Sequence, residues 1–470
     1  MDFIKRYKIP LLFSIIAIVF YISFGYHLER NDFTKLILRY GALFIISYLF
    51  IEKFKLNFWF LASLGIVFRL IFIPGIPNLS QDFYRFLWDG RLLIQGVSPY
   101  LFTPDSAAIL NKSVEQSQQL IDGMGALNAS HFSNYPPINQ LFFAIAALFA
   151  GKSILGSAIV LRVLIIFADV GILHFGSKIL KKFNLPFRNI FWYFLNPFII
   201  IELTGNLHFE GVMLFFYVWA LYLLFNGKWF RAAVLIGVSV SVKLLPLLFL
   251  PVFLKYFSTP KLNKSSQVAK SCEDSTINFR KLFKFYFIVG LTVIVTFLPF
   301  VSSEFINNFT STIGLWFQNF EFNGSVYYII RWIGFQVVGW NIIETVGKVL
   351  PIIVLLFVLG LAFFRKNKTP KQLITAMLFA VSFYFLLSTT VHPWYIATPL
   401  LLSIFTKYKF PIVWSFVVML SYSAYGKNVF DEKLWLVALE YTVVIIVAFW
   451  EISTSKYLFL KPRHNGIKNS

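Results

Sequence analysis

The sequence predicts an all-α, polytopic integral membrane protein, a helical bundle of about 14 spans. The chain has 470 residues, of which 58% are hydrophobic and 13% charged, and its mean hydropathy is +0.72. Long apolar runs recur along the whole chain without the alternation that a membrane barrel requires. The formal net charge of +21 does not require a nucleic-acid partner, because Lys and Arg gather in short connections and the tail, as the positive-inside rule predicts.

The first three spans are predicted at residues 9–26, 35–51 and 57–75. Three basic residues among the first eight place the N-terminus on the cytoplasmic side. The first span is too long for a cleaved signal peptide and lacks a small-residue cleavage site, so we expect it to remain as a membrane helix. The single cysteine, Cys272, excludes an internal disulfide and a cysteine metal cage.

Residues 76–134 follow as an external loop, and its start carries the most informative stretch, SQDFYRFLWDGRLLIQGVSPY. Asp82, Arg85 and Asp89 recur at helical spacing, so a helix places them on one face. Apolar residues recur with the same period on another face. The pattern predicts an amphipathic helix lying along the membrane surface with its acidic groups at the water boundary. A solvated linker helix is the alternative.

Eleven further apolar runs complete the spans. They cover residues 138–150, 154–177, 190–205, 211–225, 232–257, 285–301, 342–364, 373–388, 391–405, 411–425 and 434–454. We expect a disordered cytoplasmic loop at 259–284, a second external loop at 302–324 and a re-entrant or in-plane piece at 326–339. The chain then divides into a transmembrane hairpin, a module with the first external loop, and a C-terminal module. Their bounds are 1–56, 57–301 and 302–470.

One connection conflicts with this topology. Residues 178–188 carry four basic residues, yet counting spans from the N-terminus puts them outside. The same count puts residues 205–211 inside, away from Asp82. One explanation is that a short segment between residues 138 and 225 does not cross the bilayer fully.

Ionisable residues inside spans are costly, so a function is the first hypothesis for them. Lys243 lies in the middle of its predicted span, where it is expected either to pair with a buried carboxylate or to contact a lipid phosphate. Arg162 and Asp169 share one face of another span, and for them structural pairing with neighbours is the favoured interpretation.

A polar cluster interrupts apolar sequence between two glycines. Glu202, Asn206, His208 and Glu210 lie within nine residues, beside Gly205 and Gly211. This pattern predicts a broken helix that lines a cavity. The spacing matches no standard metal site.

Two further groups are expected at the external side. His392, Trp394 and Tyr395 follow a span, where the aromatic residues are either interfacial anchors or a sugar-stacking wall. Arg331 is the best candidate outside the spans for a phosphate clamp, because guanidinium matches phosphate geometry. Three residues near it are expected to face the same cavity. They are Glu321, Asn323 and Tyr327.

The motifs together resemble a known superfamily. YRFLWDGRLLIQGVSPY followed by NYPPINQL resembles the GT-C superfamily of polyprenyl-phosphate-dependent glycosyltransferases. LNPFIIIELTGNLHFEG, SVKLLPLLFLP and TVHPWY are most similar to mannosyltransferases, including bacterial members and the first mannosyltransferase of GPI-anchor assembly. The resemblance covers about residues 80–395 and implies a GT-C-type helical bundle.

The resemblance also implies a reaction, an inverting transfer of a sugar from a polyprenyl phosphate to an acceptor hydroxyl. It maps the catalytic base onto Asp82, with Asp89 as the second candidate. Many relatives carry a paired acidic motif here, whereas this chain has Gln81 beside Asp82. The incomplete pair weakens a metal assignment, so we expect no cofactor, with a divalent metal as an alternative that the residues do not support. The expected substrate-binding residues are Arg85, Tyr135, Asn206, His208, Glu210, Lys243, Arg331, His392 and Trp394.

The leading hypothesis is thus a multi-pass cell-membrane glycosyltransferase, a mannosyltransferase, with both termini cytoplasmic and the active site external. Its expected partners are a polyprenyl-phosphate sugar donor, a lipid or glycan acceptor and membrane lipids, with no nucleic acid. A transporter or flippase of lipid-linked sugars is the alternative, although the chain lacks the repeated halves typical of transporters. A non-catalytic scaffold would leave Asp82 and His392 unexplained.

Overall fold

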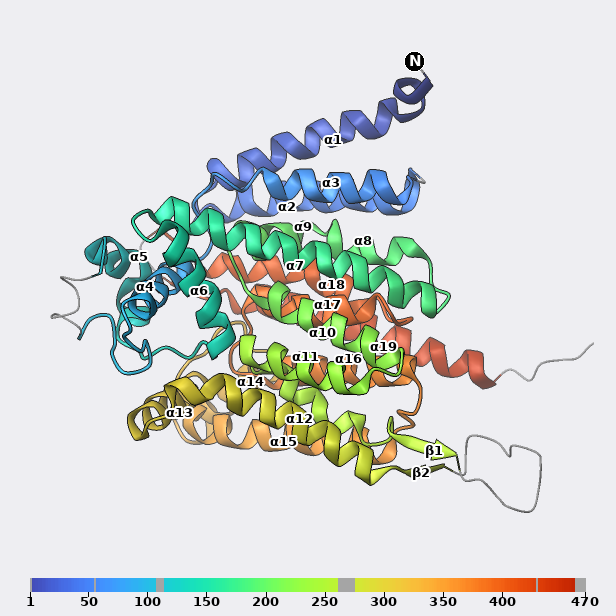
Figure 1. Cartoon of the computed structure of the whole chain (residues 1–470). Coiled ribbons are helices and arrows are strands. Elements are labelled where there is room, and N and C mark those ends of the chain that lie inside the picture. Colours follow the sequence, from blue (N-terminus) through green and yellow to red (C-terminus); the bar gives the residue numbers. More distant parts are fainter. Residues whose placement is uncertain (1, 55, 107–113, 261–274, 428–429, 461–470) are drawn as a thin grey trace, which may run out of the picture.

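The computed structural model describes residues 2–54, 56–106, 114–260, 275–427 and 430–460. Within these ranges the protein is a bundle of long helices, joined at one end by shorter helices and loops (Figure 1). The first half contains α1 Asp2–Tyr26, α2 Phe33–Tyr48, α3 Phe58–Leu70, α4 Asp82–Ile94, α5 Ser117–Ala129, α6 Pro137–Ala150, α7 Ile154–Lys182, α8 Phe191–Phe194, α9 Pro197–Ile199, α10 Glu210–Phe225 and α11 Trp229–Val242.

The second half contains α12 Phe279–Phe297, α13 Ser303–Gln318, α14 Val326–Val337, α15 Ile343–Phe364, α16 Pro370–Leu387, α17 Ala397–Ser403, α18 Phe410–Val417 and α19 Leu434–Leu460. The strands β1 Ser258–Pro260 and β2 Ser275–Ile277 pair antiparallel, with Thr259 opposite Thr276. They flank residues 261–274, so most of the loop predicted to be disordered, Cys272 included, lies outside the described residues. The end of that loop is ordered, because α12 begins at Phe279.

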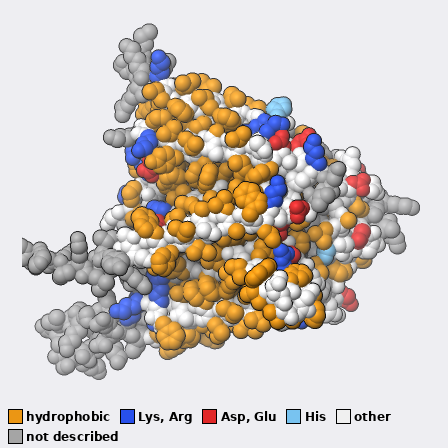
Figure 2. All heavy atoms as spheres, turned by 180° about the vertical axis from the view of Figure 1, so that it is seen from behind, with side chains coloured by type: hydrophobic (Ala, Val, Ile, Leu, Met, Phe, Trp, Pro, Cys, Tyr) orange, Lys and Arg blue, Asp and Glu red, His pale blue; other side chains and the backbone are white. Residues whose placement is uncertain are grey.

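The outer surface has the character of a membrane protein. Figure 2 shows a broad band of hydrophobic side chains between two ends where charged side chains gather. Within the described residues, seven helices are long and apolar enough to cross a membrane, or eight if the bent pair formed by Pro197–Gly205 and Glu210–Phe225 is one span. Four shorter apolar helices accompany them. A polytopic helical protein is therefore confirmed, whereas the expected number of about 14 spans is not.

The helix α6 explains the topological conflict. It has 14 residues, which gives a length of about 21 Å, short of a hydrocarbon core of about 30 Å. Figure 1 shows it beside α4 and α5 at one end of the bundle, at a steep angle to α7. The chain therefore enters α7 from the same end at which it left α3. Residues 178–188 then lie at the opposite end, together with the N-terminus and the end of α19.

The polar cluster lies where the chain bends sharply. A π-helical turn, Ile200–Gly205, continues α9 and ends there, and α10 starts at Glu210 at an angle of 113° to the first piece. Leu207 adopts a positive φ of 62°, which is unfavourable for a branched side chain and marks the break. The predicted broken helix is thus present. Its predicted place away from Asp82 is wrong, because α6 shifts the count by one crossing.

The long span predicted at residues 232–257 is also wrong. The helix α11 ends at Val242, Lys243 is extended (φ −148°, ψ 141°), and a 3₁₀-helix follows at Leu245–Phe253. Pro246 cannot donate the hydrogen bond that would continue the helix to Val242, and Pro251 removes a second donor. Lys243 therefore sits in a break and not in the middle of a helix.

The helix α4 is a core helix, contrary to both predictions for it. It packs against α5, α6 and α7, and residues Arg85 to Leu92 are all buried. Gly90 allows a close approach to α6, because a Cβ atom there would lie 2.2 Å from the backbone oxygen of Phe143. The polar face of α4 therefore points into the protein and not along a membrane surface.

Candidate active site

A cavity of about 680 Å³ opens where α4, α10, the end of α11 and the end of α16 meet. Its wall includes seven of the residues predicted as site residues. These are Asp82, Arg85, Tyr135, Glu210, Lys243, His392 and Trp394. The other four predicted residues, Asp89, Asn206, His208 and Arg331, do not line it. The structure therefore separates the predicted set into residues that line the cavity and residues that do not.

Asp82 begins α4 and faces the cavity. Its backbone N–H donates to Ser80 Oγ at 3.3 Å, and the Asn128 side chain forms a hydrogen bond with its carboxylate. Burial raises the pKa of the Asp82 carboxyl above its ordinary value, while the positive charges of Lys243 and Arg30 oppose that increase. A partly desolvated carboxylate of raised pKa is a better proton acceptor than an exposed one.

Asp89 has a structural environment. It is completely buried, and its Oδ1 accepts from Arg85 Nε at 2.7 Å. Its Oδ2 accepts from Ser133 Oγ at 2.5 Å and Gln140 Nε2 at 2.9 Å. Arg85 Nη1 also donates to the carbonyl oxygens of Asn128 and His131. Asp89 therefore anchors the loop after α5, which forms one wall of the cavity, and the geometry does not support it as the second candidate base.

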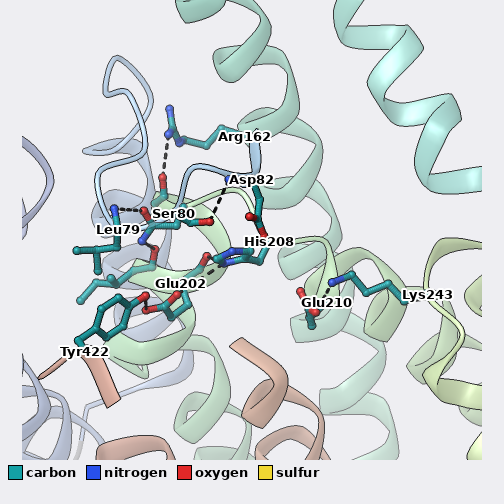
Figure 3. Close-up of polar contacts among 12 residues, drawn as sticks. Leu79, Ser80, Asp82, Arg162, Glu202, His208, Glu210, Lys243 and Tyr422 are labelled. Atoms are coloured by element: carbon teal, nitrogen blue, oxygen red, sulfur yellow. Dashed lines mark hydrogen bonds and ion pairs between the residues drawn. The ribbon is translucent and has the colours of Figure 1, made fainter. Parts of the chain in front are cut away.

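Glu210 and Lys243 form an ion pair at the cavity wall. Figure 3 shows the two side chains pointing toward each other, Glu210 from the first turn of α10 and Lys243 from the break after α11. The Glu210 side chain is 3% exposed and that of Lys243 23% exposed. The interpretation that Lys243 pairs with a buried carboxylate is therefore confirmed, and its side chain also lines the cavity.

Three stacked rings support another part of the wall. The Trp394 ring lies between those of His208 and His392, with ring centroids 3.6 Å and 4.5 Å apart. His208 is buried behind the wall, and its Nδ1 lies 2.8 Å from the carbonyl oxygen of Glu202. Burial lowers the pKa of His392 to about 3, helped by the positive charges of Arg30 and Lys243. His392 is therefore neutral at neutral pH and does not supply a cation.

Buried polar contacts hold the two segments that lead to the site. Asn206 accepts from the N–H of Leu79 at 2.9 Å, just before α4. Arg162 donates to the carbonyl oxygens of Ile73, Gly75, Thr204 and Gly205 (Figure 3 shows Arg162 above these segments). Asp169 pairs with Arg69 at 2.8 Å. Structural pairing is therefore confirmed for Arg162 and Asp169, although they do not pair with each other.

The residues predicted around Arg331 do not reach the cavity. Arg331 pairs with Glu321 and lies 4.4 Å from the centre of the Tyr328 ring. Glu321 also accepts from Tyr327 and from Asn341. Asn323 instead contacts Glu432 and Glu440. This cluster ties α14 to its neighbours, so the prediction of a phosphate clamp at Arg331 is wrong in its geometry.

Sequence reasoning missed Arg30, Asn128, Tyr425 and Phe430, which all line the cavity. Arg30 lies in the connection between α1 and α2, at the same end of the bundle as α4 (Figure 1). A basic residue at the end opposite the basic connections departs from the positive-inside pattern, and that departure was the available signal. Among the described residues, no three His, Cys, Asp or Glu side chains lie close enough to hold a metal ion.

The sequence of this chain is similar to those of known mannosyltransferases. Residues 61–258 match the family model described as "Alpha-(1->6)-mannopyranosyltransferase, N-terminal domain". The chain resembles bacterial mannosyltransferases. A curated relative, Alpha-(1->6)-mannopyranosyltransferase A of Mycobacterium tuberculosis, is 22% identical over 170 residues, which is 36% of this chain and 31% of that relative. The chain thus matches about a third of the length of this relative, and the resemblance predicted from the motifs is confirmed.

The matched segment divides the cavity. Asp82, Tyr135, Glu210 and Lys243 lie inside residues 61–258, whereas Arg30 and the wall from α16 onward lie outside that range. The similarity to mannosyltransferases therefore covers the acidic side of the cavity. The alternative of a transporter or flippase is not favoured by either comparison.

Proposed function

We propose that this protein is a membrane mannosyltransferase of the GT-C type that transfers mannose from a polyprenyl-phosphate donor to a hydroxyl of a lipid-linked or cell-envelope acceptor. The observation that carries this proposal is Asp82, a carboxylate that faces the cavity within the mannosyltransferase-like segment. Among the described residues it has no ion-pair partner.

The lining of the cavity suits a donor with a polar head and an apolar chain. The apolar side chains of the lining include Met213, Leu244, Leu245, Ile313 and Phe385. Its hydroxyl and amide side chains include Ser80, Gln81, Asn128, Ser133 and Asn134. A prenyl chain loses contact with water against the apolar side chains, and a sugar finds hydrogen-bond partners among the polar ones.

The reaction follows as a single displacement at the anomeric carbon. Asp82 accepts the proton of the acceptor hydroxyl while that oxygen attacks. The bond between the anomeric carbon and the phosphate oxygen breaks, and the phosphate leaves with the electron pair. Attack from the face opposite the phosphate inverts the anomeric configuration, so one carboxylate base is sufficient. Tyr395 offers a ring against which the sugar packs, whereas both faces of Trp394 are covered by His208 and His392.

Sugar transfer in reconstituted vesicles tests the proposal. We expect the purified full chain to move labelled mannose from polyprenyl-phosphate mannose to a membrane-extracted lipid acceptor, forming a new covalent product. Polyprenyl-phosphate glucose serves as the matched donor, and it is expected to react more slowly. Label that crosses the bilayer without forming a product would instead identify a flippase.

The orientation is part of the same proposal. We propose that the protein lies in the cell membrane with both termini cytoplasmic and the cavity at the external face. The last turn of α7 carries Lys181 and Lys182 and lies at the same end of the bundle as the start of α1 and the end of α19 (Figure 1). Basic connections on one side agree with the positive-inside rule.

Labelling of single cysteines tests this orientation. In a Cys272→Ser background, Asp122→Cys on α5 is expected to react with an impermeant maleimide in intact cells. Lys181→Cys is expected to react only after permeabilisation, because both positions are exposed but lie at opposite ends of the bundle. Reaction of both positions in intact cells would mean that α6 crosses the membrane after all.

A further inference from the structure

The charges around the cavity do not all have partners. The charged residues that line it are Arg30, Asp82, Arg85, Glu210 and Lys243. Arg85 is paired with Asp89, and Lys243 is paired with Glu210. Within the described part of the chain, Arg30 and Asp82 have no ion-pair partner. One cation and one anion at the same cavity therefore have no direct ion-pair contact among the described residues.

Arg30 is held in place by stacking. Its guanidinium carbon lies 3.3 Å from the centre of the Tyr425 ring, an arrangement that orients the planar group. Its Nε is buried and has no hydrogen-bond partner in the described residues. A buried donor without an acceptor is unfavourable, and an anion that supplied one would offset that cost.

We propose that Arg30 binds the phosphate of the prenyl donor and stabilises it as it leaves. This inference rests on the proposed function and deepens it, because it names the phosphate-binding residue. A guanidinium presents several donors in a fixed plane and matches phosphate oxygens better than an ammonium does. Arg30 also lies outside the segment that matches the mannosyltransferase family.

Lys243 is the less suitable phosphate ligand. Its charge is already balanced by Glu210, whose side chain is 3% exposed. Moving Lys243 toward a phosphate would leave that carboxylate buried without its cation, which is a large penalty. Lys243 therefore remains paired with Glu210 at the wall, whereas Arg30, which has no ion-pair partner among the described residues, can bind an incoming anion.

The charge balance of the reaction agrees with this assignment. Before transfer, Asp82 carries one negative charge and the phosphodiester of the donor carries another. When Asp82 takes the acceptor proton, it becomes neutral, and the released phosphate gains the electron pair and one further negative charge. The total charge in the cavity is unchanged while negative charge moves to the phosphate. A fixed cation at the phosphate favours that movement.

Binding of farnesyl phosphate to the detergent-solubilised full chain tests the proposal. We expect Arg30→Gln to weaken farnesyl phosphate binding by about 10- to 100-fold, the loss expected for charge-assisted hydrogen bonds. Binding of farnesol, which lacks the phosphate, is expected to stay unchanged. Arg30→Lys keeps the charge without the planar group and is expected to give an intermediate affinity. Arg331→Gln is the matched control, because Arg331 lies outside the cavity, and it is expected to bind as the wild type does.

The pH profile of transfer gives a second measurement. Burial raises the pKa of Asp82, and the positive charges of Lys243 and Arg30 and the hydrogen bond with Asn128 oppose that increase. Glu210 is the nearby anion, and it is paired with Lys243. Removing the positive charge of Arg30 raises that pKa further. The loss of transfer on acidification is therefore expected at a higher pH in Arg30→Gln than in the wild type, and a merely structural role would not move it.

The outcomes separate this inference from the proposed function. Unchanged farnesyl phosphate affinity in Arg30→Gln, with loss in Lys243→Met, would overturn the inference and leave the transferase intact. Competition by inorganic phosphate at the same concentration as farnesyl phosphate would overturn the assignment to a lipid phosphate. Binding that depends on Arg30 in a protein that transfers neither mannose nor glucose would support the phosphate site and refute the transferase.

Discussion

Asp82→Asn is expected to reduce mannose transfer by about 10³-fold, the contribution typical of a positioned general base. The amide keeps the size and the hydrogen-bonding shape of the carboxylate but cannot accept the proton. Burial raises the pKa of Asp82, so at a pH where this carboxylate is charged it lowers the free energy of unfolding. The neutral amide removes this unfavourable contribution. The thermal unfolding temperature should therefore stay the same or increase slightly.

The wild-type pH profile adds a check on the same residue. Asp82 acts as a base only when it is deprotonated, so transfer should fall as the pH falls through its pKa. Since that pKa is raised, the decline should begin at a higher pH than for an ordinary aspartate. Asp122→Asn on α5 is the matched control and should preserve both activity and profile. Full transfer by Asp82→Asn would remove Asp82 as the base.

Asp89→Asn is expected to produce the opposite result, with a loss of folding free energy on the order of 3–5 kcal/mol. The change removes the anion from a fully buried ion pair, leaving Arg85 charged without a carboxylate partner. It also disturbs the hydrogen bonds from Ser133 and Gln140, which fix the loop after α5. A thermal shift measured in detergent should show marked destabilisation.

The two substitutions control for each other, since both replace an aspartate of α4 by its amide. Asp82→Asn should lose activity and keep stability. Asp89→Asn should lose stability, while the protein that remains folded at low temperature keeps a measurable rate. If Asp89→Asn were as stable as the wild type and completely inactive, the roles of the two aspartates would have to be exchanged.

The helical membrane fold could be predicted from the sequence, because composition and hydrophobic periodicity depend directly on whether a segment lies in lipid or in water. The polar interruption around Asn206 predicted the break in the membrane helix, and a break is present. Helical spacing predicted that α4 would place Asp82, Arg85 and Asp89 together. It could not reveal that α5, α6 and α7 cover the helix, since burial depends on segments far away in the sequence. The pattern that indicated a surface helix is in fact the polar side of a packed core.

The predicted topology is wrong at one element, the helix α6, and the reason is physical. Hydropathy treats α6 as a membrane segment, yet its buried face includes Asn139 and Gln140, and Gln140 donates a hydrogen bond to Asp89. A length of 14 residues was the only local sign that it packs on the bundle instead of crossing it. Misplacing this helix reversed the expected side of residues 178–188 and of residues 205–211.

Whether the role of a site residue could be predicted depended on whether its interaction partners could be inferred from the sequence. Arg331 resembled a phosphate ligand in sequence, but Glu321, ten residues earlier, already neutralises it. Lys243 seemed to be buried in a span because the effect of Pro246 on the helix was not anticipated. Arg30 lies in a short connection far from Asp82 in the sequence, and only the fold places both residues at the same cavity. Ion-pair partners and distant neighbours are tertiary information that spacing alone does not contain.

The two-part wall of the cavity has a consequence for biosynthesis. Asp82, Glu210 and Lys243 are made early, whereas His392, Trp394 and Tyr425 leave the ribosome only after α16 has been made. Until then the nascent chain holds the proposed base beside an incomplete cavity wall, and a donor bound there would be exposed to water. On the proposed function, the order of synthesis therefore delays sugar transfer until the last helices have been made and the aromatic wall is in place.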